Sequence, residues 1–462
     1  MIAGNSAPHD YFFYRFPAIA MRAEREFYKD KLRRRMVYGS VQHFPLTPQV
    51  KEFFLARQPI LDRNEHLIGY KLLFRRAESV QSNAADDWRG ALSIIAHMSE
   101  LGMGNVIGAG RAFFSVDFNV LTHDLVKFLP SQKVVLEIPQ MIKITPELVR
   151  RVSGMVNAGY TFALDDVITF SDYIKPLLPL VDIVKINTSF MTQADLAIVA
   201  SKFKQAGKLL LAEKVDSAEQ FLNYMELGFD YYQGYYFARP VILSGKKLEP
   251  SQLAIIQLMA LLAGDADNAK IEHNLKKEVS LCVSLLKLVN SAAMGVTKNI
   301  HSLSEALVVL GRRQLQRWLQ IQLYVGSSVN PRASSPLLLL ATTRGKLLER
   351  VAQKLEPENK TTGDTAFTVG ILSLLDSLFG QSMKKILEEI SLGEDVTEAL
   401  LYRKGFYGDL LKLAEYVEKP GETSHLLPPL LARIGLRVEE LYPLQLEAFE
   451  WSNKLMPYAG EG

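Results

Sequence analysis

Several features that mark other protein classes are scarce or missing in this chain. Among its 462 residues there is a single cysteine, Cys282, which excludes an intramolecular disulfide and fits a reducing compartment. No apolar run approaches the ~20 residues that a membrane-spanning helix needs. The N-terminus lacks the layout of a signal peptide, and no glycine-rich phosphate-binding loop is found. We therefore expect a cytoplasmic protein.

An excess of charge of one sign is also missing. The 53 basic and 50 acidic residues leave a net charge of +3, which is too balanced to indicate nucleic-acid binding through bulk electrostatics. A hydrophobic fraction of 48% and a charged fraction of 22% are typical of a folded globular protein. A chain of this length favours two or three domains.

The chain changes its pattern twice. Residues 1–48 contain an aromatic stretch and the basic cluster KDKLRRR, so we expect a loosely ordered extension with a solvated helix. The alternative is a contact with a partner or an anionic surface. Within 49–242, strand-like runs alternate with helical patterns. Across 250–455, apolar residues recur at helical spacing, which predicts an all-α domain behind a linker at 243–251.

The first of these domains is predicted to be a (β/α)8 barrel of the TIM type. A short segment of turn-forming residues separates the first two strand-like runs, which indicates an antiparallel hairpin. The later runs alternate with helices, and eight strands in this arrangement favour a closed barrel. The runs are 52–60, 66–74, 111–118, 133–138, 161–166, 182–187, 208–214 and 229–237.

Polar side chains stand near the ends of most of these strands, where (β/α)8 barrels carry their functional residues. Any one of them is compatible with an ordinary solvated strand end. As a set they predict an oxygen-rich mouth of the kind that Mg²⁺ or Mn²⁺ prefers. The pair Asp165 and Asp166 is the most informative, because burying two adjacent acids brings no packing benefit. The carboxylates are Asp117, Glu137, Asp165, Asp166 and Glu213.

Seven short motifs in order resemble those of the EAL domain, the cyclic di-GMP phosphodiesterase family. They are RQPI, GYKLLFR, EIPQ, LDDV, VKIN, AEKV and QGYYFARP. The second half resembles an HDOD domain, a modified HD-type helical domain without the metal-binding histidines, through stretches such as LLKLVNSA and GILSLLD. The domain order is similar to an EAL–HDOD class of bacterial signalling proteins. This resemblance implies that the helical domain contacts other signalling proteins.

The EAL resemblance assigns roles to individual positions and also reveals departures. Lys71 stands where the family has a metal-binding glutamate, and Ile168, Thr169 and Phe170 replace a G-T-G loop. Further departures are Asp117 for asparagine, Gln140 for glutamate, Asn187 for aspartate and Lys214 for glycine. The resemblance implies metal-ligand positions at Asp117, Glu137, Asp165 and Asp166, catalytic positions at Lys185 and Glu213, and dinucleotide-holding positions at Gln58, Arg75 and Gln233.

With Lys71 in place of the family glutamate, the site has one negative ligand fewer and gains a fixed positive charge. At ~4 Å and an effective dielectric constant of about 20, one pair of unit charges is worth ~4 kcal/mol, so this ammonium opposes a bound cation. We expect Lys71 to take over the charge of the metal and to pair with at least one of Asp117, Glu137, Asp165 or Asp166. The alternative is a metal site that tolerates the lysine.

Three functions follow from these observations. The first is a non-catalytic signalling or scaffold protein with a degenerate EAL barrel, and it requires no cofactor. The second is a receptor that binds cyclic di-GMP without cleaving it, through Gln58 and Arg75. The third is an active phosphodiesterase that uses Mg²⁺ or Mn²⁺ in spite of Lys71. The altered metal shell and loop argue against the third.

Overall fold

The computed structural model describes most of the chain after the predicted N-terminal extension. The described residues are 53–76, 103–123, 126–127, 129–238, 250–291, 294, 299–325, 336–389 and 392–455. The extension and most of the predicted linker lie outside them. The described residues divide into two compact units, one within 253–319 and the other within 47–252 and 320–462. The domain limits 49–242 and 250–455 stay a prediction.

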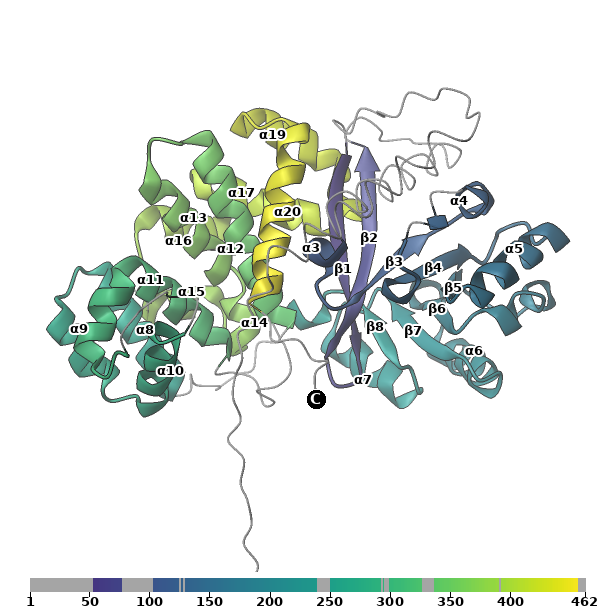
Figure 1. Cartoon of the computed structure of the whole chain (residues 1–462), viewed down its shortest axis with the longest axis horizontal. Coiled ribbons are helices and arrows are strands. Elements are labelled where there is room, and N and C mark those ends of the chain that lie inside the picture. Colours follow the sequence, from purple (N-terminus) through teal and green to yellow (C-terminus); the bar gives the residue numbers. More distant parts are fainter. Residues whose placement is uncertain are drawn as a thin grey trace, which may run out of the picture. The chain divides into compact units, whose positions relative to one another are not determined.

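Eight strands close into a barrel in chain order, with the helices of this region around it (Figure 1). The first strand runs antiparallel to both of its neighbours, and all other adjacent strands are parallel. The predicted barrel with an antiparallel first strand is therefore confirmed. The strands are β1 (Phe53–Asp62), β2 (Leu67–Arg76), β3 (Arg111–Ser115), β4 (Val134–Pro139), β5 (Thr161–Val167), β6 (Ile183–Asn187), β7 (Leu209–Glu213) and β8 (Tyr231–Gln233).

The barrel interior is filled in layers, because side chains alternate between the two faces of each strand. The apolar layer consists of Ile60, Phe113, Val135, Ala163, Ile183 and Leu211. The residue two positions nearer the mouth on each strand points the same way, and here these residues are polar. They are Gln58, Ser115, Glu137, Asp165, Lys185 and Glu213. The alternation of the strands thus gathers the polar side chains into one layer above an apolar floor.

Amphipathic helices follow the parallel strands and cover the outer face of the barrel. Several begin at a hydroxyl residue that caps the first turn: Thr145, Thr192 and Ser217 each accept a hydrogen bond from the backbone three residues later. The helices are α3 (Met103–Ile107), α4 (Phe118–Thr122), α5 (Pro146–Asn157), α6 (Gln193–Gln205) and α7 (Ala218–Glu226).

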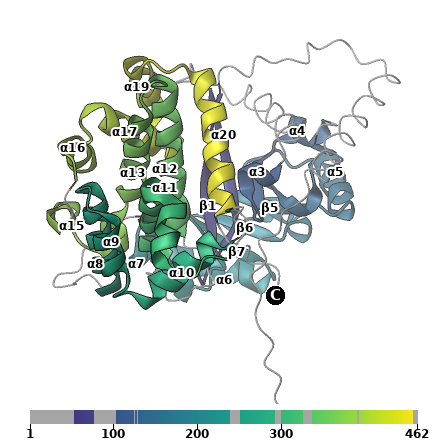
Figure 2. The same cartoon turned by 60° about the vertical axis from the view of Figure 1, so that its left-hand side comes forward.

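The same compact unit contains the helices that follow residue 320. Two of them, α12 (Pro336–Leu355) and α13 (Lys360–Leu372), pack closely because glycines face each other: a Cβ on Gly370 would lie 2.5 Å from Gly345 N. α20 (Val438–Lys454) packs along β1, as both views show (Figures 1 and 2). The others are α14 (Leu375–Phe379), α15 (Met383–Glu389), α16 (Glu394–Tyr402), α17 (Gly405–Glu418), α18 (Pro420–Thr423) and α19 (Leu427–Ile434).

The unit within 253–319 is helical in its described part. It contains most of α8 (Pro250–Ala263), α9 (Asn268–Leu275), α10 (Val279–Val289) and the first part of α11 (Leu303–Val325). Gly311 interrupts α11 with φ 71° and ψ 160°, a conformation that glycine adopts without steric cost. The predicted helical region after residue 250 is confirmed. None of the helices in the described part of the chain is both long and apolar enough to cross a membrane.

Candidate functional site

A buried cluster of opposite charges occupies the polar layer of the barrel, with Lys185 at its centre. Its Nζ lies 2.6 Å from Glu137 Oε1 and 2.8 Å from Asp165 Oδ1. The same ammonium lies 2.9 Å from Glu213 Oε1. Because the Lys185 side chain is 0% exposed, these carboxylates replace the water that would otherwise solvate its charge. Strands β4, β5 and β7 therefore present their acids to one cation from β6.

Lys71, on β2, is the second cation of the cluster. Its Nζ lies 3.0 Å from Asp165 Oδ2, forms an ion pair with Glu137 Oε2 and donates a hydrogen bond to Ser115 Oγ at 2.7 Å. Both oxygens of Glu137 and both oxygens of Asp165 thus face an ammonium group. The ion pair expected for Lys71 is confirmed with Glu137 and with Asp165.

The other two carboxylates named for this pair have different partners. Asp117 Oδ1 accepts a hydrogen bond from Val120 N at 2.8 Å and caps α4. Asp166 is exposed, has φ 59°, and accepts a hydrogen bond from Asn187 Nδ2 at 2.7 Å. Among the described residues, neither is an ion partner of Lys71. Asp117 therefore lies outside the ion pairs of Lys71, because β3 ends at Ser115 and Asp117 caps the helix that follows; its place at the mouth stays a prediction.

The charges of the cluster shift the pKa values of its members. Burial by itself would raise the pKa of Asp165, but the positive charges of Lys185 and Lys71 outweigh it and lower this pKa well below its usual range. Burial would lower the pKa of Lys185, yet the surrounding carboxylates raise it well above its usual value. For Glu213, burial raises the pKa and Lys185 offsets only part of the increase. Asp165 and Lys185 are therefore charged at neutral pH, and Glu213 is more easily protonated than Asp165.

Two glutamines lie side by side where β1 and β8 meet. Gln233 Nε2 donates to Gln58 Oε1 at 2.8 Å, while Gln233 Oε1 is buried and has no hydrogen-bond partner among the described residues. The structure thus brings together two of the three positions for which a dinucleotide contact was inferred. The side chain of the third, Arg75, lies outside the described residues.

The loop after Asp166 is held by a residue that also departs from the EAL pattern. Gln140 Nε2 donates to Thr169 O at 3.1 Å, and its Oε1 accepts from Ile168 N at 3.0 Å. This loop and α6 line a cavity of about 330 Å³. The changed residues of the loop are therefore held in place by Gln140 and form one wall of this cavity.

Sequence reasoning missed Ser115, which contacts both Lys71 and Glu137 in the interior layer. The signal was available, because Ser115 follows the buried Phe113 at the two-residue spacing of a strand. In the described part of the chain, no group of three or more His, Cys, Asp and Glu side chains has the arrangement of a metal site.

Comparisons with known proteins agree with these features. The EAL domain family model matches residues 112–240 and the HDOD domain family model matches residues 250–394. The protein YuxH of Bacillus subtilis is 28% identical over 412 residues, which cover 87% of this chain and 98% of YuxH. The cyclic di-GMP phosphodiesterase CdgJ of Vibrio cholerae is 29% identical over 413 residues, covering 87% of this chain and 93% of CdgJ.

Among solved structures, the PaMucR phosphodiesterase in complex with cyclic di-GMP matches with 16% identity and a TM-score of 0.36, covering 41% of this chain and 96% of that one. The two family matches lie along the chain in the same order as the barrel and the helices. The chain is therefore an EAL plus HDOD two-domain protein, related to YuxH and CdgJ.

Proposed function

We propose that this chain is a non-catalytic signalling or scaffold protein whose EAL barrel does not hydrolyse cyclic di-GMP. The observation that carries the proposal is the position of the Lys71 ammonium between Glu137 and Asp165. In the EAL pattern a metal-binding glutamate stands at this position. A charge of the opposite sign at the same place turns a cation-binding shell into a set of ion pairs.

The residues present do not fit Mg²⁺ or Mn²⁺. A divalent ion needs carboxylate oxygens that face it, and here the oxygens of Glu137 and Asp165 face two ammonium groups. At ~4 Å and an effective dielectric constant of about 20, each unit charge pair is worth ~4 kcal/mol, and the two charges of the metal double the repulsion. Asp117, the added acid, is occupied as the cap of α4. We therefore derive no hydrolytic step for this site.

Hydrolysis is tested with the purified full chain. CdgJ carries the name of a cyclic di-GMP phosphodiesterase at 29% identity, so cleavage must be measured rather than inferred from the relative. We expect no linear dinucleotide with Mg²⁺ or Mn²⁺ beyond the level of a Glu213→Ala control. Product formation above that control overturns the proposal. Lys71→Glu alone is not expected to restore cleavage, because the loop at 168–170 is also changed.

Binding without cleavage is a second candidate, favoured by the two glutamines. Gln233 Oε1 is a buried acceptor without a hydrogen-bond partner in the described structure, and Gln58 lies 2.8 Å from the same side chain. Leaving such an acceptor unpaired costs roughly 1–3 kcal/mol, which a ligand donor would recover. Titration with cyclic di-GMP should then give saturable binding that does not require Mg²⁺ and that weakens in Gln233→Leu. Absence of binding would exclude the receptor function and leave the scaffold function as the remaining candidate.

The helical half is proposed to contact other signalling proteins, as the HDOD domain implies. Within the unit at 253–319, Val279 is 72% exposed and Val308 is 71% exposed. A double change of both valines to aspartate should leave the thermal midpoint unaltered but remove proteins that co-purify with the wild-type chain. The same set of partners in both preparations would contradict this role.

A further inference from the structure

The β1–β2 hairpin has two faces that carry different residues. Gln58 and Lys71 lie opposite each other in the register and point into the barrel, where both belong to the polar layer. The residues immediately before them, Arg57 and Tyr70, point to the outer face and are buried there. One short stretch of backbone therefore carries mouth residues on one side and helix-facing residues on the other.

The outer face of the hairpin is held by Arg57, which is only 8% exposed. Its Nη1 donates to Val106 O at 2.7 Å and to Asn453 Oδ1 at 3.0 Å. Its Nη2 donates to Thr343 Oγ1 and to Ser452 Oγ, both at 3.1 Å. The guanidinium therefore joins strand β1 to α3, α12 and α20 at one point.

Aromatic rings complete the surroundings of this guanidinium. Arg57 Cζ lies 4.0 Å from the centre of the Phe449 ring on α20 and 4.6 Å from that of Tyr70 on β2. In the part of the chain that the structure describes, none of the hydrogen-bond or ring partners of Arg57 is a carboxylate. Its charge is balanced by oriented dipoles and ring faces, whose strength depends on direction. A small shift of β1 would therefore weaken several contacts at once.

A second connection runs through the segment after β8. Gln233 contacts Gln58 in the mouth, and two residues later the hydroxyl oxygen of Tyr235 lies 3.2 Å from Arg57 O and 3.1 Å from Glu418 O. Glu418 in turn accepts two hydrogen bonds of 2.7 Å from Arg344 on α12. The segment at the end of β8 thus carries a mouth residue, Gln233, and a helix contact, Tyr235, two positions apart.

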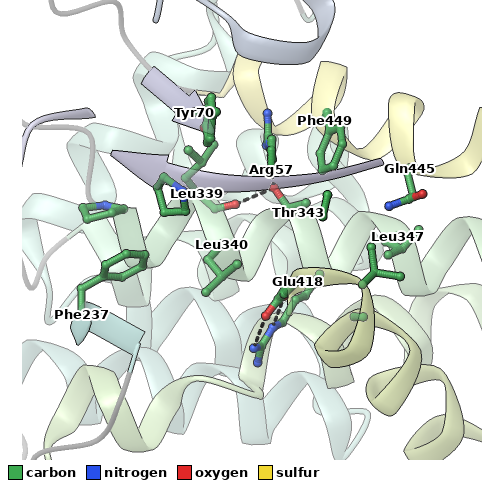
Figure 3. Close-up of a pocket in the computed structure, with 16 residues that line it drawn as sticks. Arg57, Tyr70, Phe237, Leu339, Leu340, Thr343, Leu347, Glu418, Gln445 and Phe449 are labelled. Atoms are coloured by element: carbon green, nitrogen blue, oxygen red, sulfur yellow. Dashed lines mark hydrogen bonds and ion pairs between the residues drawn. The ribbon is translucent and has the colours of Figure 1, made fainter. Parts of the chain in front are cut away.

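The contact between hairpin and helices is not fully packed. A cavity of about 50 Å³ lies there, lined by residues that include Arg57, Tyr70, Gln445 and Phe449 (Figure 3). Tyr70 Oη and Gln445 Oε1 are buried without a hydrogen-bond partner among the described residues. Free volume and unpaired polar atoms at one contact leave room for a second arrangement in which these atoms gain partners.

We propose that the β1–β2 hairpin couples the barrel mouth to the helical layer of α12, α17 and α20, with Arg57 as the positioning residue. A change of charge or occupancy at Lys71 and Gln58 shifts the hairpin, and the shift alters the directed contacts of Arg57. Such a coupling is reciprocal, so a change in the helices also alters the mouth. This inference does not require that the mouth binds a dinucleotide.

The test is a double-mutant cycle on the full chain, with Arg57→Met and Lys71→Met alone and combined. Urea midpoints of unfolding are measured for each protein. Changes at independent sites add, whereas changes at coupled sites do not. We expect the midpoint shift of the double variant to be smaller than the sum of the single shifts, because loss of Lys71 has already relaxed the hairpin that Arg57 holds.

A control cycle uses Arg350→Met, which removes a contact between α12 and α20 that is not on the hairpin. Arg350 Nε lies 2.8 Å from Glu447 Oε2, and both side chains are partly exposed. Its shift should add to that of Lys71→Met within error. If Arg57→Met does not fold, Ser452→Ala takes its place, since it removes one acceptor of the guanidinium and leaves the charge in position.

Hydrogen exchange provides a readout that a purely structural role of Arg57 would not change. Lys71→Met, a substitution inside the barrel, should alter the protection of amides in α20 relative to those of α5, which lies well apart from α20 in both views (Figures 1 and 2). Non-additive shifts in the first cycle together with changed α20 protection support the proposal. Additive shifts in both cycles, or unchanged α20 protection in Lys71→Met, overturn it.

Discussion

Two buried cations on the same hairpin are stabilised in different ways. Lys71 points inward and faces the carboxylates Glu137 and Asp165. Arg57 points outward and donates to carbonyl, amide and hydroxyl oxygens between two aromatic rings. The first is balanced by opposite charge and the second by oriented dipoles. Removing Lys71 leaves charged partners unpaired, whereas removing Arg57 leaves neutral partners unpaired.

The interior cluster also contains one carboxylate more than it has cations. Two ammonium groups, Lys71 and Lys185, face Glu137, Asp165 and Glu213. Burial raises the pKa of Glu213, and Lys185, its one ion-pair partner among the described residues, offsets only part of the increase. Charge balance in the barrel therefore depends on both lysines. We expect the interior cluster to lose more stability on loss of a cation than the surroundings of Arg57.

The largest effect is expected for Lys185→Met. Loss of one partner of a buried ion pair costs ~3–5 kcal/mol, and this lysine contacts three acids, so we expect the upper part of that range. Urea unfolding measures the change. The matched control is Lys204→Met, whose pair with Asp230 is partly exposed. Equal losses in the two variants would contradict charge balance as the basis of the cluster.

Lys71→Ala should come next, in the lower part of the same ~3–5 kcal/mol range, since Lys185 remains beside both stranded acids. It should destabilise the chain more than Lys133→Ala, where the lysine is exposed and donates to Ala109 O. Added Mg²⁺ should recover part of the loss by filling the vacated cation position. A melting temperature equal to that of the wild type would disprove the view that this lysine carries the charge of the metal.

Arg57→Met is expected to cost less than either lysine change, about 1–3 kcal/mol, because the acceptors it leaves are neutral. The same urea experiment sharpens the comparison when it is repeated at high salt. The cost of Arg57→Met should then be unchanged, since none of the groups that Arg57 contacts carries a full negative charge. A cost that matches Lys185→Met would show that the two regions do not differ as described.

The smallest effect concerns pH. The folded state raises the pKa of Glu213 above its ordinary 4.5, so ionised Glu213 opposes folding at higher pH and the penalty vanishes as pH falls through the raised value and below 4.5. Glu213→Gln should therefore be somewhat more stable than the wild type at about pH 7 and lose this advantage by about pH 4. Thermal midpoints at both values measure it; an advantage that grows on acidification would reverse the assignment.

Asp165 has the opposite sign and supplies the internal comparison. Its folded-state pKa is lowered from the ordinary 3.8, so it stabilises the fold above that value and the contribution is lost only as pH falls further. The acid range in which Glu213→Gln loses its advantage thus lies above the range in which Asp165 stops contributing. Two acids of one cluster thus have pKa values shifted in opposite directions, and their effects on stability appear in different pH ranges.

Much of the barrel was predictable because its signals are local. Alternation of period two marks each strand, and the same alternation placed Lys71 on the inner face of β2, where it pairs with Glu137 and Asp165. The alternation does not extend to Asp117, because β3 ends at Ser115 and the Asp117 side chain caps α4. Asp166, assigned to the same shell, bonds to Asn187 instead.

The sequence by itself determined the eight-stranded barrel, the helical second half and the charge that stands in the mouth, since each depends on residue type and short-range periodicity. Only the tertiary structure decided what covers the outer face of the hairpin. Arg57 and Asn453 are 396 positions apart in the chain, and no local pattern relates an arginine on a strand to a distant amide on a helix. Such pairings follow from how the packed elements fit together, because any set of acceptor oxygens and aromatic rings with suitable directions stabilises a buried guanidinium.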